Sequence, residues 1–263
     1  MDITCVSFKA DPSNRNANAT LQRFPRALAV TSANGNGLAA AGPDFEAERR
    51  EMVVRQIRRR GIRSSRVIEA METVPRHLFV PPEHAAAAYT DSPLPIGEGQ
   101  TISQPYIVAA MAEALSLDGR ERVLEVGAGS GYQAAVLSRL AQEVIAVETQ
   151  PALGAAARER LTRLAFTNVW IEEGDGSLGW PAGAPYGAIL VAAGAPAIPQ
   201  PLVDQLAEGG RLVIPVGPAD HQELLRITKK EGKLKTESLF PCRFVPLIGL
   251  HGWRPGATGS TPS

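Results

Sequence analysis

Between Gly119 and Val216 the sequence alternates short apolar segments with longer alanine-rich or amphipathic ones. The apolar segments predict strands at residues 122–126, 143–148, 169–172, 187–191 and 210–216, and the intervening segments predict helices at 133–140, 151–165 and 201–207. Strands separated by helices pair in parallel, and the connecting helices then cover both faces of the sheet. The alternation therefore predicts an α/β fold built on a Rossmann-like doubly wound sheet.

The segments on either side add smaller elements. Asp44 is predicted to cap a helix that runs to Gly61, and residues 65–73 predict a second helix. Residues 224–228 and 233–240 predict a C-terminal β-hairpin. The predicted domain thus carries an N-terminal helical segment and a C-terminal hairpin around the central sheet.

The predicted domain organisation follows from composition. Residues 44–252 predict a single domain in three parts, which are 44–118 with helices and a loop for the substrate, 119–220 with the sheet core, and 221–252 with the last strands. Residues 1–43 and 253–263 are rich in small and polar residues. Such segments bury too little apolar surface to offset chain entropy, so we expect a disordered extension and a flexible tail.

Charge and cysteine content narrow the class of protein. Lysine plus arginine and aspartate plus glutamate both number 27, and this balance gives no electrostatic reason to expect nucleic acid as a partner. Cys5 and Cys242 lie near opposite ends, and the histidines lack metal-ligand spacing. We therefore expect no metal and a reducing compartment, the cytoplasm. No apolar stretch is long enough to cross a bilayer, so we expect no membrane partner.

The first predicted strand ends in a glycine-rich turn, Gly127-Ala128-Gly129-Ser130-Gly131. Alternate glycines permit a tight turn and let a ligand approach the backbone closely. A dinucleotide fingerprint needs glycine at position 132, where this chain has Tyr132, and no Gly-Lys-Ser/Thr of a P-loop follows. The spacing therefore predicts a ligand without a pyrophosphate.

Two more polar features follow the next predicted strands. The second strand ends in Glu148, whose carboxylate is suited to accept hydrogen bonds from both hydroxyls of a ribose. The third is followed by Gly174-Asp175-Gly176, where a carboxylate could receive an adenine amino group. Ligands of such sheets bind beyond the carboxyl ends of the strands. The three features together predict a nucleoside-containing ligand at this edge.

A turn-rich segment at residues 89–106 precedes the sheet core and has no hydrophobic period of its own, and because it contains apolar residues we interpret it as an ordered active-site loop. Ser103 stands before a helix expected to begin near Pro105. Its hydroxyl could cap that helix, or it could hold a substrate carboxylate together with nearby backbone N–H groups. The two roles are compatible.

Several motifs resemble those of the protein-L-isoaspartate O-methyltransferase family, which belongs to the class I S-adenosylmethionine-dependent methyltransferases. They are 70–81 (AMETVPRHLFVP), 93–97 (PLPIG), 100–105 (QTISQP), 124–132 (LEVGAGSGY), 174–176 (GDG) and 244–247 (FVPL). The resemblance spans residues 45–250 and implies the sheet of class I methyltransferases. It also implies methyl transfer from S-adenosylmethionine to the free carboxylate of L-isoaspartyl residues in damaged proteins or peptides. The resulting methyl ester would convert to a succinimide, with S-adenosylhomocysteine as the other product.

The resemblance also implies the site residues. Ser103 is the implied catalytic residue, orienting the substrate carboxylate, because no Ser-His-Asp arrangement is evident to make it a nucleophile. Ile102, Val245 and Pro246 are implied at the substrate. The implied cofactor contacts are Ile102, Gln104, Glu125, Gly127, Ala128, Gly129, Glu148, Thr149, Asp175 and Gly176. We expect isoaspartyl proteins as substrates, no metal and a monomer.

Two departures and three rival interpretations remain. Gly187 stands where family members usually carry an acidic residue, and the segment before residue 44 is longer than the family needs. An RNA or small-molecule methyltransferase is favoured weakly by a basic helix near Arg58, and opposed by the small residues 192–196, where amine-directed enzymes carry an N/D-P-P-aromatic clamp. A non-catalytic module is opposed by the intact Ser103, Glu148 and Asp175, and a nicotinamide oxidoreductase by the glycine spacing.

Overall fold

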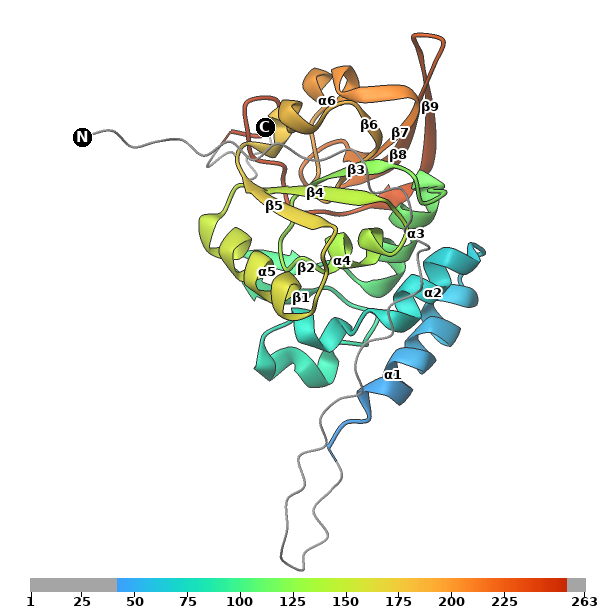
Figure 1. The fold of residues 1–263 in the computed structure, drawn as a ribbon, viewed down its shortest axis with the longest axis vertical. Helices are drawn as coiled ribbons and strands as arrows, with labels where there is room; N and C mark the ends of the chain where they lie inside the picture. The colour runs from blue at the N-terminus through green and yellow to red at the C-terminus, as the bar shows by residue number, and fades with distance from the viewer. Residues whose placement is uncertain (1–41, 255–263) are drawn as a thin grey trace, which may run out of the picture. The chain divides into compact units, whose positions relative to one another are not determined.

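The computed structural model describes residues 42–254, which contain a seven-stranded sheet of order β5-β4-β3-β6-β7-β8-β9 (Figure 1). The parallel strands are β3 (Arg122–Val126), β4 (Glu143–Glu148), β5 (Val169–Glu173), β6 (Tyr186–Val191) and β7 (Leu206–Val216). The antiparallel hairpin of β8 (Gln222–Lys230) and β9 (Lys233–Cys242) extends the sheet from β7. The doubly wound sheet and the C-terminal hairpin are as predicted. The strand order reverses between β3 and β6, where ligands of such sheets bind.

Helices cover both faces of the sheet. On one face lie α3 (Pro105–Leu115), α4 (Tyr132–Ser138) and α5 (Pro151–Arg163), and on the other lies the short α6 (Gln200–Asp204) (Figure 1). Alternate residues of one strand therefore serve different cores: Val123 packs in the cluster with α3, α4 and α5, whereas Leu124 packs in the cluster with α6. This explains why the central strands are apolar throughout.

The N-terminal segment begins as the sequence predicts and then differs from it. Asp44 caps α1 (Phe45–Met52), accepting hydrogen bonds from the amides of Glu46 (3.2 Å) and Ala47 (3.0 Å). We expected one α-helix to Gly61, but the chain continues from α1 as a π-helix, η1 (Val53–Arg58). Val53 and Ile57 in this element are both completely buried.

Shorter helices complete this part of the fold. They are α2 (Ser65–Thr73) and the 3₁₀ turns η2 (Arg76–Phe79) and η3 (Pro82–Ala87), with η4 (Gly176–Leu178) and η5 (Pro181–Gly183) later in the chain. The helix α2 lies at the predicted residues. The turns η2, η3 and η5 occupy segments in which nearby prolines disfavour regular helix.

The segment 89–106 is more regular than expected. It contains an antiparallel hairpin of β1 (Leu94–Gly97) and β2 (Gln100–Ile102). The turn residues Glu98 and Gly99 both have positive φ, 51° and 68°, as a two-residue hairpin turn of type I′ requires. Pro93 and Pro95 hide these strands from sequence analysis, because proline is tolerated only at sheet edges.

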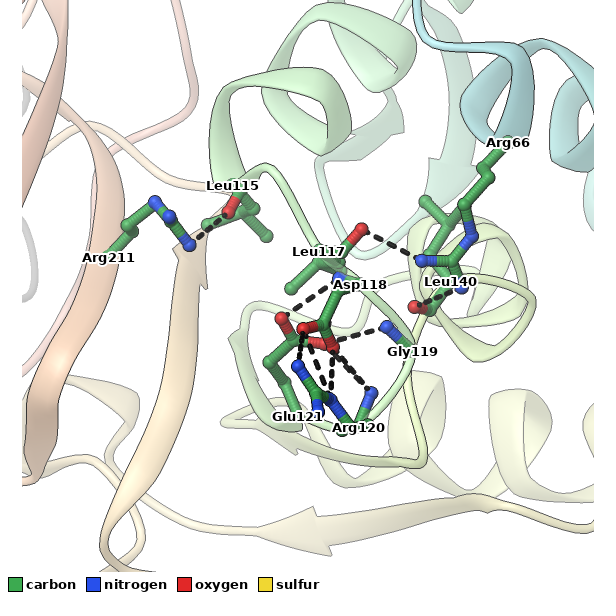
Figure 2. Close-up of polar contacts among 9 residues, drawn as sticks. All are labelled: Arg66, Leu115, Leu117, Asp118, Gly119, Arg120, Glu121, Leu140 and Arg211. Atoms are coloured by element: carbon green, nitrogen blue, oxygen red, sulfur yellow. Dashed lines mark hydrogen bonds and ion pairs between the residues drawn. The ribbon is translucent and has the colours of Figure 1, made fainter.

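A loop before β3 is closed by one carboxylate (Figure 2). The Glu121 carboxylate accepts hydrogen bonds from the backbone amides of Asp118 (2.9 Å), Gly119 (2.9 Å) and Arg120 (3.1 Å). Glycine at 187 leaves the room for this side chain, because a Cβ there would lie 2.9 Å from Cγ of Glu121. Gly187 stands where family members usually carry an acidic residue, and in this chain the acidic side chain of Glu121 on the neighbouring loop lies beside it.

The same loop is tied to distant elements (Figure 2). The Arg66 guanidinium donates to the carbonyls of Leu117 (2.8 Å) and Leu140 (3.0 Å), which joins α2 to both ends of the β3–α4 unit. Arg211 of β7 donates to the carbonyl of Leu115 at the end of α3 (3.3 Å). These contacts fix where β3 starts, and thereby where its carboxyl end lies.

The ends of the chain bear on two expectations. The predicted extension, apart from its last residues 42 and 43, lies outside the described residues, as does most of the predicted tail. Trp253, placed in that tail by sequence, instead donates through its indole N–H to the carbonyl of Gly194 (3.0 Å). Within residues 42–254, no helix combines the length and apolar character needed to span a bilayer.

We predict that Glu121→Ala lowers the free energy of unfolding by about 1–2 kcal/mol, because the loop amides lose an ionised acceptor. Gly187→Asp should cost about 1–3 kcal/mol by crowding Glu121. In the double variant, the new carboxylate has room to replace the lost one, so the combined loss should be smaller than the sum. Urea unfolding of the four proteins measures this coupling, and strict additivity would contradict it.

Candidate functional site

Two cavities meet at the carboxyl ends of the strands. The narrow cavity, of about 140 Å³, runs along the tips of β3 and β4 and is lined by most of the predicted site residues: Ile102, Ser103, Glu125, Gly127, Ala128, Gly129, Glu148, Thr149, Gly176, Val245 and Pro246. The wide cavity, of about 840 Å³, lies between α3 and β9. Thr101, Ser103, Ala192, Val245 and Pro246 line both. The structure thus brings the predicted catalytic serine to the junction.

Glu148 connects two elements of the narrow cavity. One carboxylate oxygen accepts from the Gly129 amide (2.8 Å), and the other accepts from the amides of Thr149 and Gln150 (both 2.9 Å). Gly129 has φ 51°, which glycine adopts without strain. Each carboxylate oxygen can accept a second hydrogen bond. The predicted ribose-binding carboxylate therefore lines the cavity in a fixed orientation.

Close backbone packing shapes the floor of the cavity at Gly176. A Cβ at this position would lie 2.5 Å from Cγ1 of Val126, which ends β3. Only glycine lets the chain after β5 come this close to the glycine-rich turn. The Gly176 backbone consequently lines the narrow cavity.

Glu125 is fully buried in β3, at 0% exposure, and neither carboxylate oxygen has a hydrogen-bond partner. Burial raises the pKa of this carboxyl well above its usual value, and the nearby charge of Glu148 raises it further. An unpaired buried carboxyl is costly to folding. Its position on the cavity wall indicates a role toward a ligand.

Gln133 is a cavity residue that sequence reasoning missed. It is the second residue of α4, it lines the narrow cavity, and it is only 9% exposed. Its amide nitrogen has no hydrogen-bond partner. The sequence signal that could have identified Gln133 as a cavity residue was its place in the first turn of the helix that follows the glycine-rich turn.

Ser103 lies between β2 and α3. The N-cap of α3 is Gln104, so the interpretation of Ser103 as the cap is wrong. The cap falls one residue later because Pro105 already occupies the first helical position. Ser103 is half-buried and makes no hydrogen bond within residues 42–254, so its hydroxyl is available to a ligand.

The C-terminal segment forms the shared wall of the two cavities. The Gly194 amide donates to the carbonyl of Val245, and the Leu247 amide donates to the carbonyl of Gly194, both at 2.8 Å. These bonds place Val245 and Pro246 beside the end of β6, where both cavities reach them. Both residues thus line the same two cavities as Ser103, and their contact with a substrate stays a prediction.

Two predicted cofactor residues stand apart from the narrow cavity. Gln104 lines only the wide cavity, and Asp175 lines neither. One Asp175 oxygen accepts from the amide and hydroxyl of Ser177 (2.9 and 2.7 Å), and the other accepts from the Leu250 amide (2.7 Å). In this structure Asp175 therefore holds the C-terminal segment, and its contact with an adenine stays a prediction.

Comparison with known proteins decides the family. The family model described as protein-L-isoaspartate(D-aspartate) O-methyltransferase matches residues 48–252. The chain belongs to this family. It is 56% identical to the protein-L-isoaspartate O-methyltransferase of Methanoculleus marisnigri over 79% of this chain and 94% of the relative. The identity to that of Geobacter metallireducens is also 56%, over 80% and 98%.

Solved structures of family members agree. A protein-L-isoaspartate O-methyltransferase superposes with a TM-score of 0.70 at 31% identity, covering 78% of this chain and 67% of its own. A Plasmodium falciparum homologue, solved in complex with S-adenosyl-L-homocysteine, superposes with a TM-score of 0.65 at 28% identity, covering 78% of this chain and 98% of its own.

In residues 42–254, no group of three or more His, Cys, Asp or Glu side chains could hold a metal ion.

We predict that Glu125→Gln stabilises the ligand-free protein, and more so as pH rises. Folding raises the pKa of Glu125. Burying its carboxyl therefore costs little folding free energy at a pH below the pKa of the unfolded state, and the cost grows as the pH rises from there toward the pKa of the folded state. The gain should grow from near zero at about pH 4.5 by up to about 1.4 kcal/mol per pH unit.

Melting temperatures between about pH 5 and pH 8 measure this difference. Glu83→Gln, at an exposed position, is the matched control and should show no widening gap. A pH-independent effect of Glu125→Gln would contradict the prediction.

Proposed function

We propose that this protein transfers the methyl group of S-adenosylmethionine to the free carboxylate of L-isoaspartyl residues in damaged proteins or peptides. Membership of the family supports the activity. The observation that carries the assignment in this chain is Ser103, whose unpaired hydroxyl lies where the narrow and wide cavities meet. A cofactor in the one and a peptide in the other would face each other at this residue.

The residues of the narrow cavity fit the cofactor. The buried, unpartnered carboxylate of Glu125 can accept from a cationic group, and Glu148 offers its remaining acceptor capacity to a ribose. The Gly176 backbone leaves a slot that a Cβ would fill. Carboxylates and backbone groups of the protein account for this fit, and we propose a cofactor site without a metal.

The proposed reaction needs little general acid–base catalysis from the protein. Bound S-adenosylmethionine supplies a methyl group on a sulfonium, and the substrate carboxylate, already ionised near neutral pH, takes it up as a methyl ester. Ser103 orients that carboxylate through a hydrogen bond, while the wall at Val245 and Pro246 limits its approach. Positioning of this kind is a large source of rate enhancement.

The wide cavity suits a peptide. Its wall combines arginines with aromatic side chains, and the aromatic ones include Phe240, Phe244 and Tyr106. The guanidinium of Arg60 lies 3.6 Å from the centre of the Tyr106 ring and pairs with Asp91 (2.8 Å), which places a cation at the cavity wall. A cleft with apolar and polar sites accepts an extended chain segment around the isoaspartyl residue.

We further propose that the protein works as a cytoplasmic monomer on isoaspartyl proteins, without nucleic acid or membrane as partners. The balance of 27 basic and 27 acidic residues offers no attraction to a polyanion. Two cysteines in the whole chain suit a reducing compartment.

We expect the protein to transfer labelled methyl groups from S-adenosylmethionine to an isoaspartyl peptide but not to its normal aspartyl twin. The two peptides have the same charge and differ only in which carboxylate is free. Base-labile radioactivity recovered with each peptide measures the transfer. Equal labelling of both peptides, or labelling of neither, would overturn the proposed function.

Ser103→Ala should reduce kcat by about 10- to 100-fold while leaving the Kd for S-adenosylhomocysteine within about twofold. The hydroxyl is proposed to orient the substrate and not to hold the cofactor. Ser92→Ala, in the same segment but outside both cavities, is the control and should keep full activity. A Ser103 variant that mainly loses cofactor affinity would contradict this role.

A further inference from the structure

Among residues 42–254, the charged side chains that line the wide cavity are Arg60, Asp220 and Arg243. The charge of Arg60 is compensated within the protein, because its guanidinium pairs with Asp91 at 2.8 Å. Arg243 is exposed, and its guanidinium makes no hydrogen bond or ion pair with the described part of the chain. Its positive charge therefore faces the cavity without a partner from the described residues.

The backbone that carries Arg243 is held in place. Arg243 directly follows β9. The next residue, Phe244, donates its amide to the side-chain oxygen of Gln222 (2.9 Å), and the Val245 carbonyl accepts from the amide of Gly194 (2.8 Å). The segment thus has a fixed position on the cavity wall, while the guanidinium is available to a ligand.

The position of Arg243 relative to Ser103 indicates which part of a substrate it contacts. Ser103 and Val245 line both cavities, whereas Arg243 lines only the wide one, so its charge lies on the peptide side. Arg243 precedes Val245 by two residues, and two residues of an extended chain span at most about 7 Å. A bound peptide covers the same length in two residues. With an isoaspartyl residue at Ser103, the side chain two positions away along this wall would therefore reach Arg243.

We propose that Arg243 directs this methyltransferase to isoaspartyl residues that have an aspartate or glutamate two positions away, an inference that rests on the proposed function. The guanidinium presents its donors in a planar fork that matches a carboxylate. Because the pair forms in contact with water, it contributes modestly to binding. Arg243 is thus a specificity-determining residue, which selects among damaged sites by the charge of their neighbours.

Asp220 acts against this selection. Hydrogen bonds from its own backbone amide and from His221 hold the pKa of its carboxyl below the usual value, so it is ionised near neutral pH. It lines the same cavity as Arg243, where its negative charge repels an acidic substrate and attracts a basic one. The two residues set the charge preference of the cavity in opposite directions.

Three isoaspartyl peptides of one sequence test the selection, with glutamate, glutamine or lysine at the second position on each side of the isoaspartyl residue. Acetylated and amidated ends leave these side chains as the only difference in charge. For the wild-type protein, kcat/KM should be about two- to fivefold higher for the glutamate peptide than for the glutamine peptide, and lowest for the lysine peptide. Added salt should reduce this difference, because it screens exposed charges.

Variants of the two cavity residues should change the order of the peptides. Arg243→Gln should bring the three values of kcat/KM to within about twofold of one another, and Arg243→Glu should make the lysine peptide the best substrate. Asp220→Asn should widen the preference for the glutamate peptide. Arg59→Gln removes an exposed arginine that lines neither cavity, and as the matched control it should keep the wild-type order.

The peptide series separates the possible failures. If the wild-type protein methylates all three peptides with equal kcat/KM, or Arg243→Gln lowers kcat/KM by the same factor for all three, the inference is overturned while the proposed function stands. The second result would place Arg243 at the reacting carboxylate, which the peptides share. If the wild-type protein labels none of the isoaspartyl peptides, the proposed function itself fails.

Discussion

The carboxylate of Glu148 is the contact on which the rest of the site depends. It joins the end of β4 and the adjoining start of α5, which it holds through the Gln150 amide, to the glycine-rich turn after β3, which it holds through the Gly129 amide 19 residues away in the sequence. The turn itself has few side chains with which to hold its shape. Because an ionised acceptor binds backbone N–H groups more strongly than a neutral one, a single residue sets the geometry of the cavity floor.

The site is also where the chain departs from the most stable arrangement. A leucine in place of Glu125 would suit the surrounding apolar strand, yet the protein buries a carboxyl with no partner there. Groups held in unfavourable environments gather at functional sites, because the ligand supplies the missing interaction. The carboxylates of Glu125 and Glu148 differ in this respect, since one is satisfied by the protein and the other is not. Glu148 is the carboxylate that the protein satisfies, whereas the partner of Glu125 is left for a ligand to supply.

Much of the fold could be predicted from the sequence because it depends on local patterns. Apolar strands that alternate with helices indicated the doubly wound sheet, and the glycine spacing located its ligand edge. The hairpin at 94–102 was missed because its prolines conceal a strand pattern, and the π-helix at 53–58 because residue spacing alone does not reveal i→i+5 bonding. The isolation of Asp175 from the cavity depends on contacts with residues distant in sequence, such as the hydrogen bond from the Leu250 amide, and no local pattern records these.

The shared wall at Val245 and Pro246 comes from nearly the last part of the described chain, and it is fastened by contacts of Trp253 and Leu250 with Gly194 and Asp175. A protein made from its N-terminus completes β3, β4 and the glycine-rich turn well before this segment leaves the ribosome. The nascent chain could therefore form a nucleoside site that has no partition from the peptide cleft. An enzyme built in this order gains the wall shared by its two cavities only after its cofactor edge is complete.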